Sequence, residues 1–200
     1  GLPSSFGGGD DDPDDNGGLF KSYYEFETAH LPEPGEFLDG HDVLTGPDHV
    51  AFHRLTRDLF GERTVYDMTF NYNLARLNLD TRHPGAGYRY ANERETDGIL
   101  RAEFTPTTPF CPQTHTLTIG SFRAWNGLRD RHDYELVRVR AASMHHQSQL
   151  INQQLEALET EFERTGTVPE GSMGGDALGS NPMERAKRAE RQSRGPDAPF

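Results

Sequence analysis

Hydrophobic and polar positions follow regular periods only in the middle of the chain, and these periods define the elements expected there. Apolar residues at helical spacing predict three helices, over residues 47–60, 112–128 and 146–164. Segments rich in β-branched, aromatic and other apolar residues predict three strands, over residues 88–92, 99–105 and 134–140. Gly61 is expected to end the first helix, and residues 72–80 fit either a strand or a short irregular segment.

The order of these elements, α-β-β-α-β-α, predicts an α+β fold in which helices pack on a small mixed sheet of about three strands. The domain is expected at residues 47–164, preceded by an extension at residues 19–46. Aromatic residues of the extension are expected to pack on the domain, and a partner-binding role is the less favoured alternative. These residues are Tyr23, Tyr24, Phe26 and Phe37.

Both ends of the chain lack such periods. Residues 1–18 combine glycines with a run of aspartates, and residues 165–200 are rich in glycine and proline. Such segments bury too little apolar surface to offset the entropy of ordering, so we expect two disordered tails. The second tail carries a short basic segment, residues 183–194, which is expected to be solvated. Docking of this segment on an acidic partner or RNA is the alternative.

The charge of the chain limits the classes of partner that it can bind and indicates the kind of organism in which it works. A formal net charge of -12 disfavours direct binding to nucleic acid. Among the 20 basic residues only Lys21 and Lys187 are lysines, a bias that favours a salt-adapted organism over a GC-rich genome alone. There is no apolar run long enough to span a bilayer and no signal-peptide pattern. We therefore expect a soluble, cytoplasmic protein that does not bind membranes.

Cys111 is the single cysteine, and it stands between Pro109 and Pro112, where the second predicted helix begins. A cysteine at the amino end of a helix is close to free N–H groups and to the positive end of the helix dipole, which favour the reactive thiolate. A buried, inert thiol is the competing interpretation. One cysteine forms no intrachain disulfide and supplies one strong ligand, so a metal or cluster would have to be shared with another molecule.

Two motifs on either side of the last strand resemble one known family. Residues 104–111 read Phe-Thr-Pro-Thr-Thr-Pro-Phe-Cys, and residues 117–120 read Leu-Thr-Ile-Gly. Residues 144–155 read Met-His-His-Gln-Ser-Gln-Leu-Ile-Asn-Gln-Gln-Leu. This pattern resembles the SufT/PaaD-like family of iron–sulfur cluster assembly proteins, which includes the small targeting subunit of the cytosolic iron–sulfur assembly machinery. The resemblance covers about residues 47–160 and marks the chain as a divergent member.

The resemblance implies that Cys111 handles an iron–sulfur cluster or iron, held transiently. The family's acidic Asp-Pro-Glu turn is missing, and Asp67 is the candidate for its acidic position. The insert at residues 71–92 also departs from the family pattern. Further candidate ligands are His115, one helical turn after Cys111, and His146, for which a structural role at a helix start is equally favoured.

Other patterns carry weaker signals. His49 and His53 have the i, i+4 spacing of a metal-binding pair, although buried or surface histidines are the commoner outcome at this spacing. Glu159, Glu161 and Glu163 are expected on the solvated face of the last helix. Neither nucleotide-binding glycine motif is present.

These features together predict an adaptor, rather than an enzyme, that assembles or delivers iron–sulfur clusters to client or assembly proteins. A homodimer would supply a second Cys111. One alternative is a repurposed, non-catalytic interaction module of a larger assembly. A thiol-dependent enzyme with Cys111 as nucleophile is the less favoured alternative.

Overall fold

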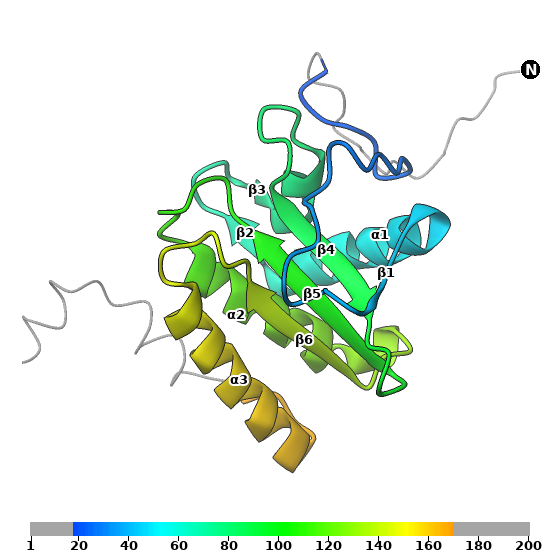
Figure 1. Cartoon of the computed structure of the whole chain (residues 1–200), viewed down its shortest axis with the longest axis vertical. Coiled ribbons are helices and arrows are strands. Elements are labelled where there is room, and N and C mark those ends of the chain that lie inside the picture. The colour runs from blue at the N-terminus through cyan, green and yellow to red at the C-terminus, as the bar shows by residue number, and fades with distance from the viewer. Residues whose placement is uncertain (1–17, 170–200) are drawn as a thin grey trace, which may run out of the picture. The chain divides into compact units, whose positions relative to one another are not determined.

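The computed structural model describes residues 18–169. Its main sheet has the order β1-β4-β5-β6 (Figure 1). The strands are β1 (Asp42–Val43), β4 (Gly87–Asn92), β5 (Ile99–Thr105) and β6 (Leu136–Ala141). β4 is antiparallel to both β1 and β5, whereas β5 and β6 run parallel. A parallel pair needs a crossover connection, and α2 provides it.

Within residues 18–169, three α-helices and several short elements complete the fold. The helices are α1 (Gly46–Arg63), α2 (Thr114–Gly127) and α3 (Ser148–Thr165). The short elements are a hairpin of β2 (Tyr66–Asp67) and β3 (Tyr72–Asn73) and the 3-10 turns η1 (Leu74–Leu79) and η2 (Arg129–Arg131). The α+β class and the main order α-β-β-α-β-α are confirmed.

Three local expectations were wrong or incomplete. α1 does not end at Gly61 but continues to Arg63, because Thr64 adopts the left-handed conformation (φ 58°) and its N–H bonds to the Phe60 carbonyl. Residues 72–80, for which a strand and a short irregular segment were both open, consist of the two residues of β3 followed by the 3-10 turn η1. The sheet gains a fourth strand because β1, from the extension, pairs with β4.

Trp125 of α2 is at the centre of the core, between the sheet and two helices. Its ring is fully buried and lies 4.9 Å from the ring of Tyr88 on β4 and 5.0 Å from that of Phe60 on α1. Its indole N–H donates a hydrogen bond to Thr56 Oγ1 at 3.0 Å, so the buried polar atom is satisfied. This face of the sheet is therefore sealed by aromatic packing.

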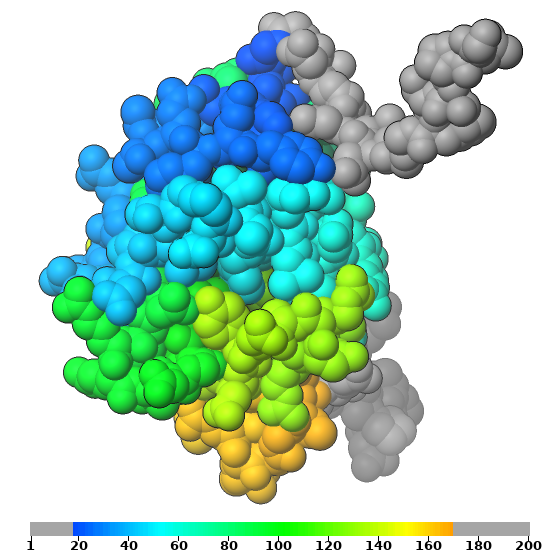
Figure 2. Space-filling model, turned by 90° about the vertical axis from the view of Figure 1, so that its right-hand side faces the viewer, coloured from blue at the N-terminus to red at the C-terminus, as the bar shows by residue number. Residues whose placement is uncertain are grey.

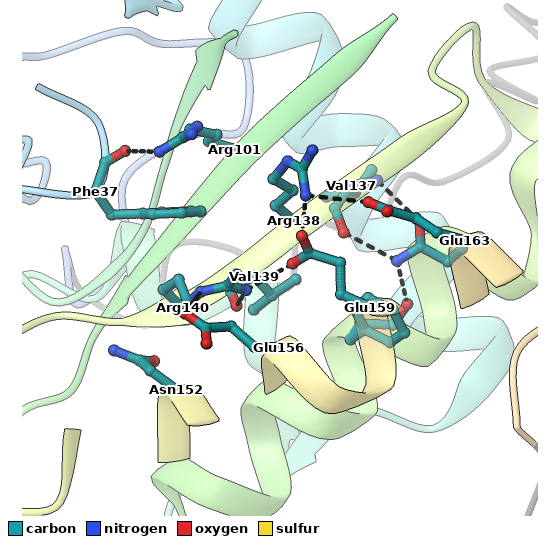
Figure 3. Close-up of polar contacts among 12 residues, drawn as sticks. Phe37, Arg101, Val137, Arg138, Val139, Arg140, Asn152, Glu156, Glu159 and Glu163 are labelled. Atoms are coloured by element: carbon teal, nitrogen blue, oxygen red, sulfur yellow. Dashed lines mark hydrogen bonds and ion pairs between the residues drawn. The ribbon is translucent and has the colours of Figure 1, made fainter. Parts of the chain in front are cut away.

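The opposite face of the sheet is lined by charged residues that pair with one another (Figure 3). On β6, Arg138 and Arg140 both bond to Glu159 of α3. Arg138 also pairs with Glu163 at 3.2 Å and with Glu93 at 3.3 Å. Glu159 was expected on a solvated face, but it is only 5% exposed. The expectation was wrong because two arginines of the neighbouring strand neutralise its carboxylate.

The extension covers the rest of this charged face. Buried Glu103 of β5 accepts hydrogen bonds from the N–H groups of Gly35 and Phe37. The Phe37 ring lies 4.7 Å from the guanidinium of Arg101 and 5.1 Å from that of Arg140. A Cβ at Gly35 would lie 2.8 Å from the Glu103 carboxylate, so a larger residue here would displace that carboxylate from its present position.

The first part of the extension lies over α1 (Figure 2). Tyr23 is buried and its ring stacks on His53 of α1, whereas Tyr24 is exposed and accepts a hydrogen bond from Arg54. Phe26 packs on His49. Together with the Phe37 contacts, these interactions confirm that the aromatic residues of the extension pack on the domain.

His49 and His53 are structural residues in this arrangement. Both ring nitrogens of His53 are engaged, Nδ1 with the Tyr90 hydroxyl and Nε2 with the Ala75 carbonyl, each at 2.7 Å. The two imidazoles stack at 5.6 Å. Burial lowers the pKa of His49 to about 3 and that of His53 to about 4. The pair therefore forms part of the core and is not a metal site.

Other expectations concern the membrane and the tails. Within residues 18–169, none of the helices combines the length and the apolar character that crossing a bilayer requires. The two tails and the basic segment at residues 183–194 fall largely outside the described residues.

Replacing Glu159 with alanine is expected to lower the free energy of unfolding by about 3 kcal/mol, because it leaves Arg138 and Arg140 without their shared carboxylate. Glu161→Ala is the matched control: Glu161 lies on the same helix and pairs only with exposed Arg164, so the expected change is below about 0.5 kcal/mol. Urea unfolding of both variants measures the difference. Equal losses in the two variants would contradict the proposed importance of the network.

The buried histidine pair is expected to make the fold acid-sensitive. The folded-state pKa values lie below the ordinary 6.5, so the unfolded chain takes up protons first as the pH falls. The stability contributed by the neutral rings is complete above about pH 6.5 and is lost progressively toward pH 4 and 3.

The variant His49→Phe removes one of these groups. Relative to wild type, it is expected to reduce the stability loss between about pH 7.5 and about pH 5 by about 2 kcal/mol. His41→Phe, at a partly exposed position before β1, serves as control. Unfolding curves over this pH range give the slopes, and the same slope for wild type and His49→Phe would refute the assignment.

Candidate functional site

The parallel strands β5 and β6 end at the same edge of the sheet, and the loops that follow them form the candidate site. The first loop joins β5 to α2 and contains Cys111; the second joins β6 to α3 and contains His145 and His146. Figure 1 shows the two loops side by side at this edge, next to the hairpin β2–β3. Residues far apart in the sequence therefore meet around Cys111.

Cys111 lies in a turn just before α2. Its N–H donates to the Thr108 carbonyl at 3.3 Å, and its own carbonyl accepts from Thr114 N–H at 3.5 Å. The helix begins at Thr114 with Gln113 as N-cap, so the start expected at residue 112 was two residues early. Residues 111–114 first close a turn, which Pro112 accommodates because its φ is fixed and it needs no acceptor. Cys111 is partly exposed.

Gln113 occupies the N-cap position, but its side chain bridges to the hairpin instead of capping α2. Its side-chain oxygen accepts from Met68 N–H at 2.9 Å, and its amide nitrogen donates to Thr69 Oγ1. No side chain caps the helix here. The bridge holds residues 67–70 against the Cys111 loop.

Asp67 lies at the base of this hairpin, buried at 4% exposure. Its carboxylate accepts hydrogen bonds from the N–H groups of Thr69 and Phe70, at 2.8 and 3.1 Å. Asp67 is thus close to the Cys111 loop in the fold, but the contacts of its side chain are to its own turn. Its local role is to fix the loop that Gln113 binds.

His145 supports the Cys111 loop directly. It is 3% exposed, and its Nε2 donates to the Cys111 carbonyl at 2.9 Å. Its Nδ1 accepts from Gln147 N–H at 3.1 Å. An imidazole that accepts at one nitrogen and donates at the other is neutral and has no free lone pair. His145 therefore joins the two loops and offers no metal-binding nitrogen.

His146 is exposed, and its ring nitrogens are hydrogen-bonded differently from those of His145. Its Nδ1 lies 2.8 Å from the Pro109 carbonyl, which can only accept, so this nitrogen carries the proton. In the neutral ring, Nε2 then keeps its lone pair. A backbone carbonyl that fixes the protonated nitrogen of an imidazole is also the usual support of metal-binding histidines. The ring lies 5.2 Å from that of Phe110.

His115 is half-buried on α2 and is separate from this group. Burial lowers its pKa, and the neighbouring Gln154 side chain of α3 opposes the shift. Its contact is therefore with α3, and no hydrogen bond joins it to Cys111. Within residues 18–169, histidine, cysteine and acidic residues form no group of three or more that could hold a metal ion.

The two segments around Cys111 carry no charged residues. Residues 104–122 and 141–155 contain no Asp, Glu, Lys or Arg, although 26% of the chain is charged. Four large side chains are exposed on these two segments and on the adjoining hairpin: Phe110 at 71%, Met144 at 41%, Leu150 at 54% and Met68 at 77%. We call these four residues the apolar surface.

Sequence reasoning missed both Gln113 and the apolar surface. The absence of charge over two long stretches of an acidic chain was a signal that could have found the surface. The bridging role of Gln113 had no such signal, because it depends on the position of a hairpin 44 residues away.

The loss of His145 is expected to destabilise the fold far more than the loss of His146. His145→Ala removes a buried ring and leaves the Cys111 carbonyl with only its long hydrogen bond from Thr114 N–H, which should cost about 2 kcal/mol or more. His146→Ala removes an exposed ring and should cost less than about 1 kcal/mol. Thermal unfolding of the two variants tests this ranking, which the opposite order would overturn.

Comparison with known proteins gives one match. A family model described as Domain of unknown function (DUF7998) matches residues 18–169. No curated protein and no solved structure matches the chain.

Proposed function

This chain belongs to the family described as Domain of unknown function (DUF7998), and we propose that it is an adaptor for iron–sulfur cluster assembly or delivery. In this proposal Cys111 binds the cluster, or an iron ion, as cargo. The protein works with client or assembly proteins in the cytoplasm of a salt-adapted organism and turns over no substrate of its own.

The observation that carries the proposal is the direct contact between the two motifs that resemble the SufT/PaaD-like family. They lie on different loops, and His145 and His146 of one motif bond to the backbone of Cys111 and Pro109 of the other. A pattern of residues that meets at one exposed cysteine supports a shared role for the two segments. The partly exposed thiol can be reached by a partner.

The donor set suits transient binding. Cys111 supplies one thiolate, a ligand that iron–sulfur clusters favour. His146 supplies an imidazole nitrogen on a neighbouring loop, whereas Asp67 accepts hydrogen bonds from its own turn and His115 lies beside α3. Two donors are fewer than a cluster needs, so the remaining ligands come from a client, a small thiol or a second copy. Incomplete ligation favours release to a client.

The state of His145 removes this residue as the general base of a thiol-dependent enzyme, and leaves His146 as the imidazole of this loop with a free nitrogen. His145 is the imidazole bonded to the Cys111 backbone, but both of its nitrogens are engaged, so it cannot take a proton from the thiol. Nucleophilic catalysis by cysteine usually needs such a base.

The apolar surface supports a second candidate, an interaction module of a larger assembly that uses no cluster chemistry. Interface cores are depleted of charge and enriched in aromatic residues and methionine, as this surface is. In that case the function would depend on Phe110 and Leu150 but not on the thiol of Cys111.

Anaerobic purification followed by an absorption spectrum and iron analysis tests the adaptor proposal. Wild type is expected to carry or accept an iron–sulfur cluster and to show its absorption. Cys111→Ser should lose nearly all of this absorption, because the only thiolate is gone. His146→Ala should retain less iron than wild type, whereas His41→Ala, far from the site, should retain the wild-type amount.

Maturation of iron–sulfur enzymes in cells provides the functional measurement. Unchanged maturation in a strain carrying only the Cys111→Ser protein would sink the adaptor proposal. If maturation fails with Phe110→Asp but not with Cys111→Ser, the interaction module is the better description.

A further inference from the structure

Arg89 on β4 is a buried cation without an acidic partner. It is only 3% exposed. The less deeply buried Arg101 and Arg140 each pair with a carboxylate at 2.8 Å. Within residues 18–169, no carboxylate forms an ion pair with Arg89, which donates to a backbone carbonyl instead. A charge in a protein interior is costly unless it is paired, so this guanidinium needs a counter-charge from another source.

The neighbours of the Arg89 guanidinium supply no negative charge. One of its terminal N–H groups donates to the Pro32 carbonyl at 3.1 Å, and its central carbon lies 5.7 Å from the centre of the Phe26 ring. Glu103 is opposite Arg89 in the sheet register, but its carboxylate accepts its hydrogen bonds from the backbone of the extension. The buried Nε–H of Arg89 has no acceptor in the described part of the chain. An unneutralised positive charge and an unused donor therefore occur together.

His49 of α1 provides a second unused nitrogen next to Phe26. Its ring lies 5.4 Å from the Phe26 ring, and its buried Nδ1 has no hydrogen-bond partner among residues 18–169. Burial, His53 and the positive charge of Arg89 all lower the pKa of His49, so the ring is neutral. A neutral imidazole donates from one of its nitrogens, and Nδ1 can be that donor. Arg89 and His49 thus offer two enclosed N–H groups around one aromatic ring.

We propose that a chloride ion binds at Arg89, with the Nε–H of Arg89 and the Nδ1–H of His49 as its donors. An anion there neutralises the buried guanidinium, and its hydrogen bonds satisfy both nitrogens. Because both nitrogens are enclosed, a monoatomic ion suits the site better than a phosphate or a carboxylate ligand. The site is independent of Cys111 and of the proposed function.

The chloride site joins three segments of the fold. Phe26 and Pro32 belong to the extension, Arg89 to β4 and His49 to α1. Bound chloride therefore links the docking of the extension to the chloride concentration. This effect is specific to a small anion, whereas screening of the net charge depends only on ionic strength.

A crystal of the full chain soaked in sodium bromide tests the position of the ion, because bromide replaces chloride and scatters anomalously. The expected result is an anomalous peak within hydrogen-bond distance of Arg89 Nε, which crystals of Arg89→Met lack. Bromide bound only at the protein surface, or an equally strong peak in Arg89→Met, would overturn the proposal. Since the wild-type map alone can refute the site, the test does not depend on the folding of the variant.

Thermal unfolding in solution measures the contribution of the ion. Gluconate is replaced by chloride at a constant molar concentration of potassium, since gluconate is too large for an enclosed site. Chloride should raise the melting temperature of wild type at least about 5 °C more than that of Arg89→Met. Arg94→Met is the matched control, because Arg94 follows β4 but is exposed and pairs with Asp42. It should respond like wild type within about 1 °C. Equal chloride responses of wild type and Arg89→Met would refute a site at Arg89.

Discussion

The parallel pairing of β5 with β6 is the constraint on which the candidate site depends. Because the chain must cross over through α2 to bring β6 beside β5, both strands end at the same edge of the sheet. The Cys111 loop and the His145 loop follow these ends and are joined by hydrogen bonds to backbone carbonyls. Antiparallel pairing would have placed the two loops at opposite ends of the sheet.

The two faces of the sheet are stabilised in different ways. On the second face, the extension contributes by forming hydrogen bonds with buried charged groups. One face is sealed by aromatic packing around Trp125. The other face holds arginines and glutamates that are costly to bury unless they are paired. Glu159 of α3 neutralises two of the arginines, and the backbone around Phe37 satisfies Glu103 and Arg101. The extension is therefore part of the folded unit.

The segments around Cys111 differ from the rest of this acidic chain because they contain no charged residues. Charged residues make up 26% of the chain, whereas the segments 104–122 and 141–155 around Cys111 contain none. Repulsion between acidic molecules opposes contact everywhere except at such a neutral region. The apolar surface and the only thiol of the chain thus occupy the same part of the fold, so binding of a partner and ligation of a cargo are expected to be coupled.

Much of the fold could be predicted from periodicity. Residues 99–105 were expected as a strand and form β5, and the main order of elements was correct because burial on one face imposes a period that local sequence retains. Ends of elements were less accurate: Gly61 did not stop α1, and α2 began two residues after the expected start. Caps and turns depend on single backbone conformations, such as the left-handed Thr64, which periodicity does not report.

The sequence by itself determined that Cys111 is the only thiol, that it lies between a strand and a helix, and that its surroundings are free of charge. Only the tertiary structure decided the roles of its neighbours. His145 and His146 are adjacent in sequence, yet one has both nitrogens engaged and the other keeps a lone pair. Glu159 and Glu161 are two residues apart, yet only Glu159 is buried against arginines. The physical reason is that hydrogen-bond partners and burial come from segments distant in the chain, which meet only when the sheet is assembled.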